Sequence, residues 1–410
     1  MKAFRACLLL TSFAVLTGWA RGQASVEERL KALETRLEQL AEENAELRRQ
    51  LGAANPAASP ASHAAAASDS PAVVAPVVVQ PAGKEAKISV GGFLQGQAEF
   101  GHASDPRWAD VRDRFFFRRA RLYVAGSFAD DFEFKAELDL QGNTLSAGTG
   151  HRAQGNEIFI NWRKYPGAMV RFGQLKPAFG AEQLASDTKT LTIERFLGND
   201  RLTDGRQLAV SLWGDLLDKK ISYMLVAGNG IGSNVSANDN SKFQRSARVA
   251  YTPFATASGR LTVGANGLWT EDAAVTRPGL GFTGNSFAGK RSGVGLDAQV
   301  TVGRADFGAE WLKMNYRPIN AVPQADFDAH AWHVTAGYFL FPAKLQAVVR
   351  RESFDPNSRR GGDVIDSWLL GLNYLIKGDD LKLQVNYLLG DTPGSTADGG
   401  RLLTRMQVLF

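Results

Sequence analysis

From residue 88 to the end of the chain, apolar and polar side chains alternate over short segments. In the clearest of these, residues 132–140, the even-numbered side chains are apolar and the odd-numbered ones are charged. Successive side chains of a β-strand point to opposite faces, so this period of two predicts a strand with one oily and one hydrophilic face. The apolar face contacts either the core of a soluble β-sandwich or the acyl chains of a membrane.

The spacing of these segments distinguishes the two architectures. Long polar loops, including residues 175–206 and 270–292, alternate strictly with short turns such as residues 303–304. Outer-membrane barrels have an even number of strands, short periplasmic turns and long external loops, whereas a sandwich has no reason to collect its long loops at one end. We therefore predict an all-β domain over residues 88–410, a 16-stranded antiparallel transmembrane β-barrel. Its strands are expected near residues 88–100, 115–128, 132–140, 156–163, 168–174, 207–214, 220–228, 244–253, 260–269, 293–302, 305–314, 331–340, 344–353, 367–375, 381–389 and 401–410.

Aromatic residues support the membrane interpretation. Phe410 ends the last predicted strand and resembles the terminal aromatic residue that outer-membrane assembly machinery reads. Others cluster at strand ends, where a membrane protein has an interfacial girdle. This predicted girdle contains Trp162, Trp213, Trp269, Trp311 and Tyr387.

A heptad repeat precedes the predicted barrel. Apolar residues and one asparagine, Asn44, recur in alternating steps of four and three between Val26 and Leu51. This spacing predicts an N-terminal α-helical coiled coil over residues 25–51, in which Asn44 fixes the register at some cost in stability. A single amphipathic helix packed on a globular core is the alternative. Residues 52–87 are rich in Ala and Pro and are expected to form an extended linker.

The first 24 residues are interpreted as a secretory signal peptide. Lys2 and Arg5 precede an apolar run that is roughly half as long as a bilayer-spanning helix requires, and small residues follow it. Cys7, the single cysteine, lies within this segment, so we expect neither a disulfide nor a cysteine-based metal site in the exported protein. We expect no cofactor. The net charge of +5 is too small for a chain of this length to indicate a nucleic-acid partner.

Several stretches of the predicted barrel resemble one known family in their order and spacing. They are residues 117–122 with 134–137, residues 170–180 with 193–195, and residues 371–374 and 404–410. This part of the chain is similar to the phosphate-selective porin O/P family. The resemblance implies a homotrimer of 16-stranded barrels in the bacterial outer membrane, in contact with membrane lipid. It also implies that each barrel has its own pore, narrowed by the third long loop, here residues 175–206.

The resemblance also indicates where an anion would bind. In anion-selective members of the family, lysines and arginines line the pore, and the guanidinium fork matches phosphate oxygens. Arg119 and Arg121 share the inward phase, whereas Arg118 has the opposite phase and lies inside only if a bulge turns it, as the paired arginines of the family favour. Otherwise Arg118 lies at the aqueous rim. The candidate pore-lining and anion-binding residues are Arg118, Arg119, Arg121, Lys135, Arg171, Lys176 and Arg195, with Arg112 and Arg114 at a possible pore entrance.

Two questions about function stay open at this level. Basic and acidic residues balance within 175–206, and the barrel has no long ladder of arginines at every second position, so phosphate specificity and a broader pore with mild anion preference are both compatible with the sequence. The predicted function is a passive, water-filled channel for small solutes, with anions such as phosphate expected. The alternative is an envelope-anchoring structural protein whose coiled coil grips the cell wall or a periplasmic partner, and deletion of residues 26–87 would separate the two roles.

An enzyme is not expected. A lipase-type site needs a serine, a histidine and an acidic partner gathered together. Four of the five histidines lie in the linker or in predicted loops, and only His333 lies on a predicted strand. We interpret His333 as a polar lumen residue.

Overall fold

The computed structural model describes residues 87–410 except for 103, 109–110, 142–151, 320–324 and 396–398. It also describes Val78 and Val79 and three isolated helical positions, Lys31, Gln39 and Glu42. Apart from these positions, the predicted signal peptide (1–24), coiled coil (25–51) and linker (52–87) lie outside the described residues. These three segments, and the envelope-anchoring role of the coiled coil, stay predictions. Within the described part, no helix combines the length and apolar character needed to cross a bilayer.

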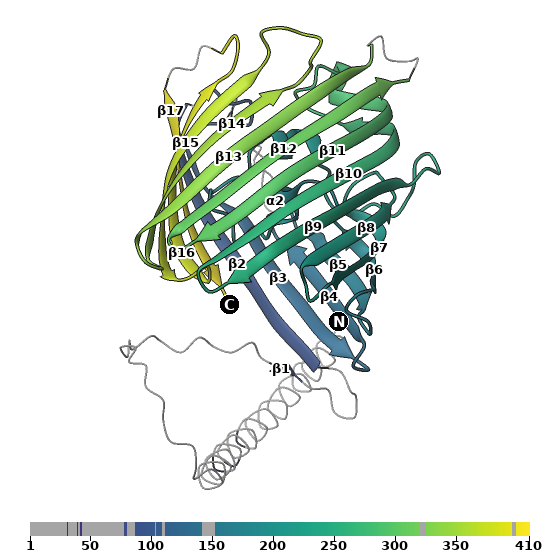
Figure 1. Ribbon diagram of the computed structural model, residues 1–410, viewed down its shortest axis with the longest axis vertical. Helices are drawn as coiled ribbons and strands as arrows, with labels where there is room; N and C mark the ends of the chain where they lie inside the picture. The colour runs from purple at the N-terminus through teal and green to yellow at the C-terminus, as the bar shows by residue number, and fades with distance from the viewer. Residues whose placement is uncertain are drawn as a thin grey trace, which may run out of the picture. The chain divides into compact units, whose positions relative to one another are not determined.

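Sixteen antiparallel strands close into a barrel, as the alternating pattern predicts (Figure 1). Each strand pairs with the next along the chain, and the last strand pairs with the first, with Arg401 opposite Gly101 and Leu409 opposite Phe93. A two-residue strand, β1 (Val78–Val79), pairs with β2 beside this ring. The barrel strands are β2 (Lys87–Gly101), β3 (Arg114–Phe128), β4 (Phe132–Asp139), β5 (Gln154–Trp162), β6 (Met169–Leu175), β7 (Gln207–Leu216), β8 (Ile221–Gly228), β9 (Gln244–Thr256), β10 (Gly259–Thr276), β11 (Ser286–Val302), β12 (Ala305–Pro318), β13 (Phe327–Phe341), β14 (Leu345–Asp355), β15 (Ile365–Lys377), β16 (Leu381–Asp391) and β17 (Gly400–Leu409).

The outer face of the barrel is apolar. On β15, for example, Trp368, Leu370 and Leu372 are about half exposed, whereas Ser367 and Asn373 on the other face are buried. A soluble sandwich would bury such a face in its core, since a continuous apolar surface is costly in water. The outward side chains therefore meet acyl chains, as in outer-membrane barrels.

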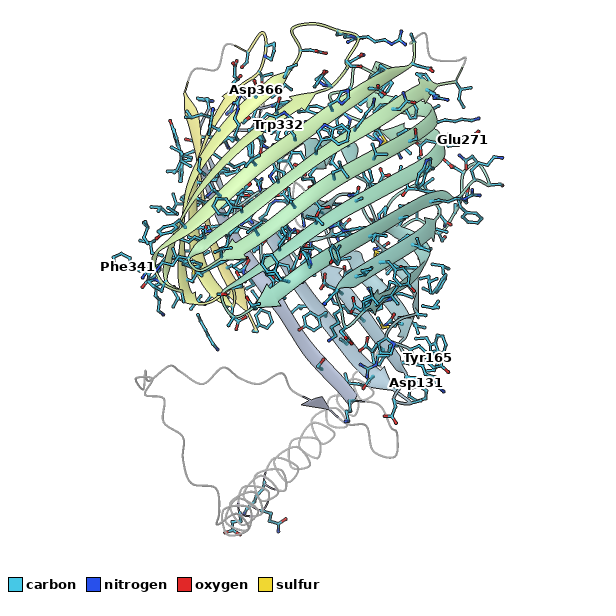
Figure 2. All side chains as sticks on the ribbon, viewed as in Figure 1. Asp131, Tyr165, Glu271, Trp332, Phe341 and Asp366 are labelled. Atoms are coloured by element: carbon cyan, nitrogen blue, oxygen red, sulfur yellow. The ribbon has the colours of Figure 1, made fainter. Side chains whose placement is uncertain are left out.

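Short turns and long loops lie at opposite ends of the barrel, as predicted. Figure 2 shows Asp131, Tyr165 and Phe341 at the end with the short turns, and Asp366 toward the other end. The turn at Gly303 is one of the tightest, and its positive φ of 57° is a conformation that favours glycine. The end with the short turns is the periplasmic end, and the end with the long loops faces outward from the cell.

Several strands continue further outward than expected. The predicted bounds of loop 270–292 are wrong, because β10 continues to Thr276 and β11 begins at Ser286. The ladder between these strands has a bulge between Asp272 and Val275. His330, placed in a loop by the sequence, lies in β13. The antiparallel ladder needs only backbone partners, so it continues where the apolar alternation that marks the membrane has stopped.

Part of the barrel interior is apolar, which the charged inner face of residues 132–140 did not suggest. Inward side chains of β10 and β12 pack against two inward-folded segments, residues 176–206 and residues 277–285. This inner cluster includes Leu268, Leu312, Met314 and Tyr316 from the wall, Phe179, Phe196, Leu197 and Leu202 from the first segment, and Leu280 and Phe282 from the second. Protein replaces water along this part of the wall, so apolar side chains are favoured there.

Candidate functional site

The segment between β6 and β7, residues 176–206, folds into the barrel and is named here the constriction loop. It contains two short helices, α2 (Ala181–Leu184) and α3 (Leu197–Leu202). Its backbone forms hydrogen bonds with inward side chains of β16, which is distant in the sequence. Lys382 Nζ donates to the Thr188 carbonyl at 2.8 Å, and the Ile193 N–H donates to Asn386 Oδ1 at 2.7 Å. The loop therefore crosses the lumen, as the family resemblance implied.

A bulge on β3 turns two neighbouring arginines to the same side. Gln95 of β2 pairs with Arg119 and Gly96 pairs with Phe117, so Arg118 is the extra residue on the bulged strand. An extra residue shifts the alternation by one position, and Arg118 and Arg119 are both buried while Phe117 stays exposed outside. The bulge thus resolves the phase of Arg118 that the sequence left open.

Asp187 of the constriction loop is the carboxylate on which three arginines converge. Its Oδ2 lies 2.7 Å from Arg121 Nη1, and its Oδ1 lies 2.6 Å from Arg195 Nη2 and 3.4 Å from Arg119 Nη2. Burial by itself would raise the pKa of Asp187, but Arg119, Arg195 and Arg121 outweigh it and hold the pKa well below its usual range. Asp187 therefore stays ionised and ties the loop to β3.

Glu194 makes the second ionic attachment. Its Oε1 lies 2.9 Å from Arg118 Nε and 2.5 Å from Arg405 Nη2 on β17. Burial acts to raise the pKa of Glu194, yet Arg118 and Arg405 together lower it. We name Asp187 and Glu194 with their five arginine partners the docking network.

The far side of the loop is held differently. Glu182 forms an ion pair with Arg350 of β14, and its Oε2 accepts the Phe196 N–H at 2.9 Å. Phe196 is fully buried in the inner cluster. Gly198 lets α3 approach β13, because a Cβ at this position would lie 2.1 Å from the Cβ of Ala331. The loop is therefore anchored by ion pairs to β3 and β17 on one side, and by apolar packing together with the Glu182–Arg350 ion pair on the other.

Two cavities flank the loop, and Ala185 and Ser186 line both. The first, of about 540 Å³, has an excess of carboxylates: Glu182, Asp297, Asp306, Glu310 and Asp379, with Lys189, Arg350 and Lys382. The second, of about 360 Å³, has four basic groups against three acidic ones: Arg121, Lys135, Lys176 and Arg206, with Glu137, Glu157 and Asp187. We name the second the cationic cavity.

The sequence candidates fall into three groups. Arg121, Lys135 and Lys176 line the cationic cavity. Arg118, Arg119 and Arg195 bind the carboxylates of the loop. The remaining candidates lie elsewhere: Arg171 stacks between Phe159 and Trp213 at 4.3 and 4.7 Å, Arg114 Nε lies 3.2 Å from Glu99, and Arg112 is exposed.

One member of the predicted girdle is misplaced. Trp213 faces the lumen, where its Nε1 donates to Asn161 Oδ1 at 3.0 Å. It stands in the inward phase of β7 together with Ser211, which is fully buried. Trp269, Trp311 and Tyr387 are exposed on the outer face, as a girdle requires.

Residues 94–410 match the family described as phosphate-selective porin O and P. The chain belongs to this family.

Individual relatives agree with this assignment. Porin O of Pseudomonas aeruginosa is 24% identical over 289 residues, which cover 67% of this chain and 61% of that protein. The chain thus spans about three fifths of the length of this relative. Among solved structures, the outer-membrane channel DcaP of Acinetobacter baumannii superposes with a TM-score of 0.55 at 15% identity, covering 79% of this chain and 97% of the other. An anion-selective porin from Comamonas acidovorans superposes with a TM-score of 0.54 at 12% identity, covering 80% and 100%. These structures share the fold of this chain, a closed antiparallel β-barrel. Membership of the porin family, together with this fold, indicates a protein integral to the outer membrane.

The sequence missed several arginines of this porin that the fold brings to the inner wall. They are Arg291, Arg350, Arg401 and Arg405, each almost completely buried. The signal that could have found them is strand phase: Arg405 alternates with the exposed Met406, and Arg350 alternates with the exposed Val349. An ionisable side chain on the inward phase of a barrel strand is a candidate for the lumen.

Proposed function

We propose that this porin is a passive, water-filled channel for small solutes that prefers inorganic anions such as phosphate. Support for a channel comes from the family, since its description and its relatives are porins. Support for an anion comes from the cationic cavity beside the constriction loop, where a solute that passes the loop meets four basic side chains. Low dielectric walls strengthen such charges relative to bulk water.

Lys176 is the residue that carries the proposed preference. The other cations of the cavity are bound to carboxylates: Arg121 to Asp187, and Lys135 and Arg206 to Glu157. Lys176 Nζ instead donates to the backbone carbonyls of Gln183 and Ala185, and no described carboxylate forms an ion pair with it. Burial, together with the nearby cations Arg195 and Arg206, lowers the pKa of Lys176 well below its ordinary value. Asp187 and Glu157 offset only part of this effect, and an anion beside the amine favours its protonated, charged form.

The reversal potential of the purified porin tests this proposal in a planar bilayer under a KCl gradient. We expect the wild type to be anion-selective. Lys176→Gln should lower the anion-to-cation permeability ratio by roughly two- to fivefold, which corresponds to about 0.5–1 kcal/mol of lost attraction. Lys189→Gln is the matched control, because Lys189 lies on the same loop but is exposed to the other cavity.

Two outcomes would count against the proposal. A cation-selective wild type would rule out the anion preference while leaving the porin assignment intact. An unchanged ratio in Lys176→Gln would mean that the permeating ion does not pass this ammonium group.

We further propose that the porin is a homotrimer whose contact face is formed by β4–β8. These strands have between 7 and 10 residues, whereas β10 and β11 have 18 and 17. A tilted strand needs about 9–11 residues to cross the hydrocarbon layer, so the shortest ones fit poorly against lipid alone. Their outward side chains are apolar, and Ile160 and Phe172 stand directly opposite each other. One of the similar structures is a trimer form of the outer-membrane protein OmpT from Vibrio cholerae.

Light scattering of the porin in mild detergent measures the number of copies in the assembly directly. We expect the mass of three copies for the wild type and a smaller assembly for Ile160→Asp combined with Phe172→Asp. The control is Val349→Asp combined with Leu370→Asp on β14 and β15, on the opposite wall, where both residues are exposed and stand opposite each other. A monomeric wild type would contradict the trimer.

A further inference from the structure

The outer face of the barrel carries a groove at its external end that the channel does not use. Its volume is about 640 Å³, and residues 241–243 lie beside outward side chains of β9–β12 along it. We name it the rim groove. Figure 2 shows one of its residues, Glu271, at the outer edge of the barrel. Its charged outward side chains are Lys242, Arg245, Glu271, Lys290 and Arg317, and the aromatic side chains of Phe243 and Trp269 are exposed beside them.

Strand register places these side chains in two adjacent rows. In one row, Arg245 of β9 stands opposite Trp269 of β10. In the next row outward, Lys290 of β11 stands between Glu271 of β10 and Arg317 of β12. Neighbouring strands are about 4.8 Å apart, so the basic groups of β9, β11 and β12 lie within roughly 15 Å of one another.

The groove has more positive charge than its own carboxylates balance. Glu271 is its single acidic lining residue, and Asp326 lies 3.9 Å from Arg317. Among the residues that the structure describes, no carboxylate forms an ion pair with Lys242, Arg245 or Lys290. Lys290 and Arg317 are like charges directly opposite each other on a sheet, an arrangement that destabilises the strand pair unless an anion lies between them.

The position of the groove relative to the membrane indicates where that anion comes from. Trp269 is half exposed on the outer face, and Val294 and Leu296 continue an exposed apolar track toward the periplasmic end. Exposed tryptophans lie at the level of lipid headgroups, with acyl chains beyond them. The cations therefore stand at the headgroups of the external leaflet, outside the pore.

We propose that the rim groove binds the phosphorylated headgroup of a lipid in the external leaflet. Lys290 and Arg317 hold one phosphate between them, since guanidinium and ammonium groups donate charge-assisted hydrogen bonds to its oxygens. Arg245 and Lys242 bind the remaining negative charge, and Trp269 packs against the lipid body. This site is independent of the solute pathway.

The test uses the full-length porin in nanodiscs of phosphatidylcholine that contain a small fraction of lipid A or of its dephosphorylated form. Bound lipid is measured by native mass spectrometry. The wild type should retain lipid A and not the dephosphorylated form. Arg245→Ala combined with Lys290→Ala should weaken retention by about tenfold or more, since each surface cation contributes roughly fivefold toward an anionic headgroup.

The matched control removes the same charge at the other end of the barrel. Lys219→Ala combined with Lys220→Ala changes two exposed lysines in a periplasmic turn and should leave lipid retention unchanged. Conductance should be the same in all three proteins, which shows that the variants fold. Equal retention by wild type and the Arg245/Lys290 variant would overturn the proposal. So would full displacement of lipid A by millimolar inorganic phosphate, which would make the groove a site for free anions.

Discussion

Replacing Asp187 with Asn is expected to free the constriction loop from β3, increase single-channel conductance and lower the free energy of unfolding by about 3 kcal/mol. Removing one partner of a buried ion pair leaves an uncompensated charge, which typically costs roughly 3–5 kcal/mol. We expect the lower end of this range because two of the arginines keep other partners. Arg121 still forms an ion pair with Asp139 at 2.9 Å, and Arg195 still donates hydrogen bonds to the carbonyls of Glu182 and Ala185. Arg119 loses the most charge compensation, since its remaining hydrogen-bond partner among the described residues is Gln95, at 2.9 Å.

Conductance in planar bilayers and urea unfolding from lipid vesicles measure the two effects. Asp218→Asn is the control, because Asp218 is exposed in a periplasmic turn. The pH dependence gives a second check. The folded protein holds the pKa of Asp187 below its unfolded value, so the stabilisation is complete above pH about 4 and is lost as the pH falls further. The stability difference between wild type and variant should therefore shrink below pH 4. Unchanged conductance and stability at pH 7 would show that Asp187 does not hold the loop.

Phe196→Ala is expected to have a comparable effect from the other side of the lumen. The ring is fully buried, with its centroid 4.6 Å from that of His333, and it packs in the inner cluster. Truncating a buried phenylalanine to alanine costs about 3–5 kcal/mol, because the transfer energy is lost and a cavity is left. We expect this loss of unfolding free energy and a noisier open-channel current, since α3 is no longer pinned to the wall.

The control for this variant is Phe341→Ala. Phe341 is 64% exposed at the periplasmic end of β13, so it has far less packing to lose. Its substitution should change stability by less than about 1 kcal/mol. If Phe196→Ala and Phe341→Ala behaved alike, the apolar anchor would not be what positions the loop.

The two anchors change how the basic residues of this porin are interpreted. From sequence, every arginine near the constriction is a candidate for binding a passing anion. In the folded barrel, Arg118, Arg119 and Arg195 bind Asp187 and Glu194 of the loop, so their charge shapes the pore and is not free for a solute. Under the proposed function, we expect selectivity to depend on the cations of the cationic cavity, and on Lys176 in particular.

The alternation of residues 132–140 and the turn at Gly303 illustrate what the sequence alone determined. Strand phase and turn chemistry are local properties, so they predicted the number of strands, their order and the end at which the long loops lie. The inward phase of Arg119, Arg121 and Lys135 followed from the same rule. The family resemblance added the inward fold of the constriction loop, which no local pattern of the loop specifies.

Only the tertiary structure decided which charges meet. Arg118 and Glu194 are 76 residues apart in the chain, and Arg405 is 211 residues from Glu194. A period of two says which way a side chain points, but its partner depends on how a distant loop folds across the lumen. The apolar inner cluster has the same origin: Leu312 and Met314 face inward by strand phase, and apolar side chains are favoured there because the loops 176–206 and 277–285 displace water from that wall. Local sequence thus specified the barrel, and long-range packing inside it specified the pore.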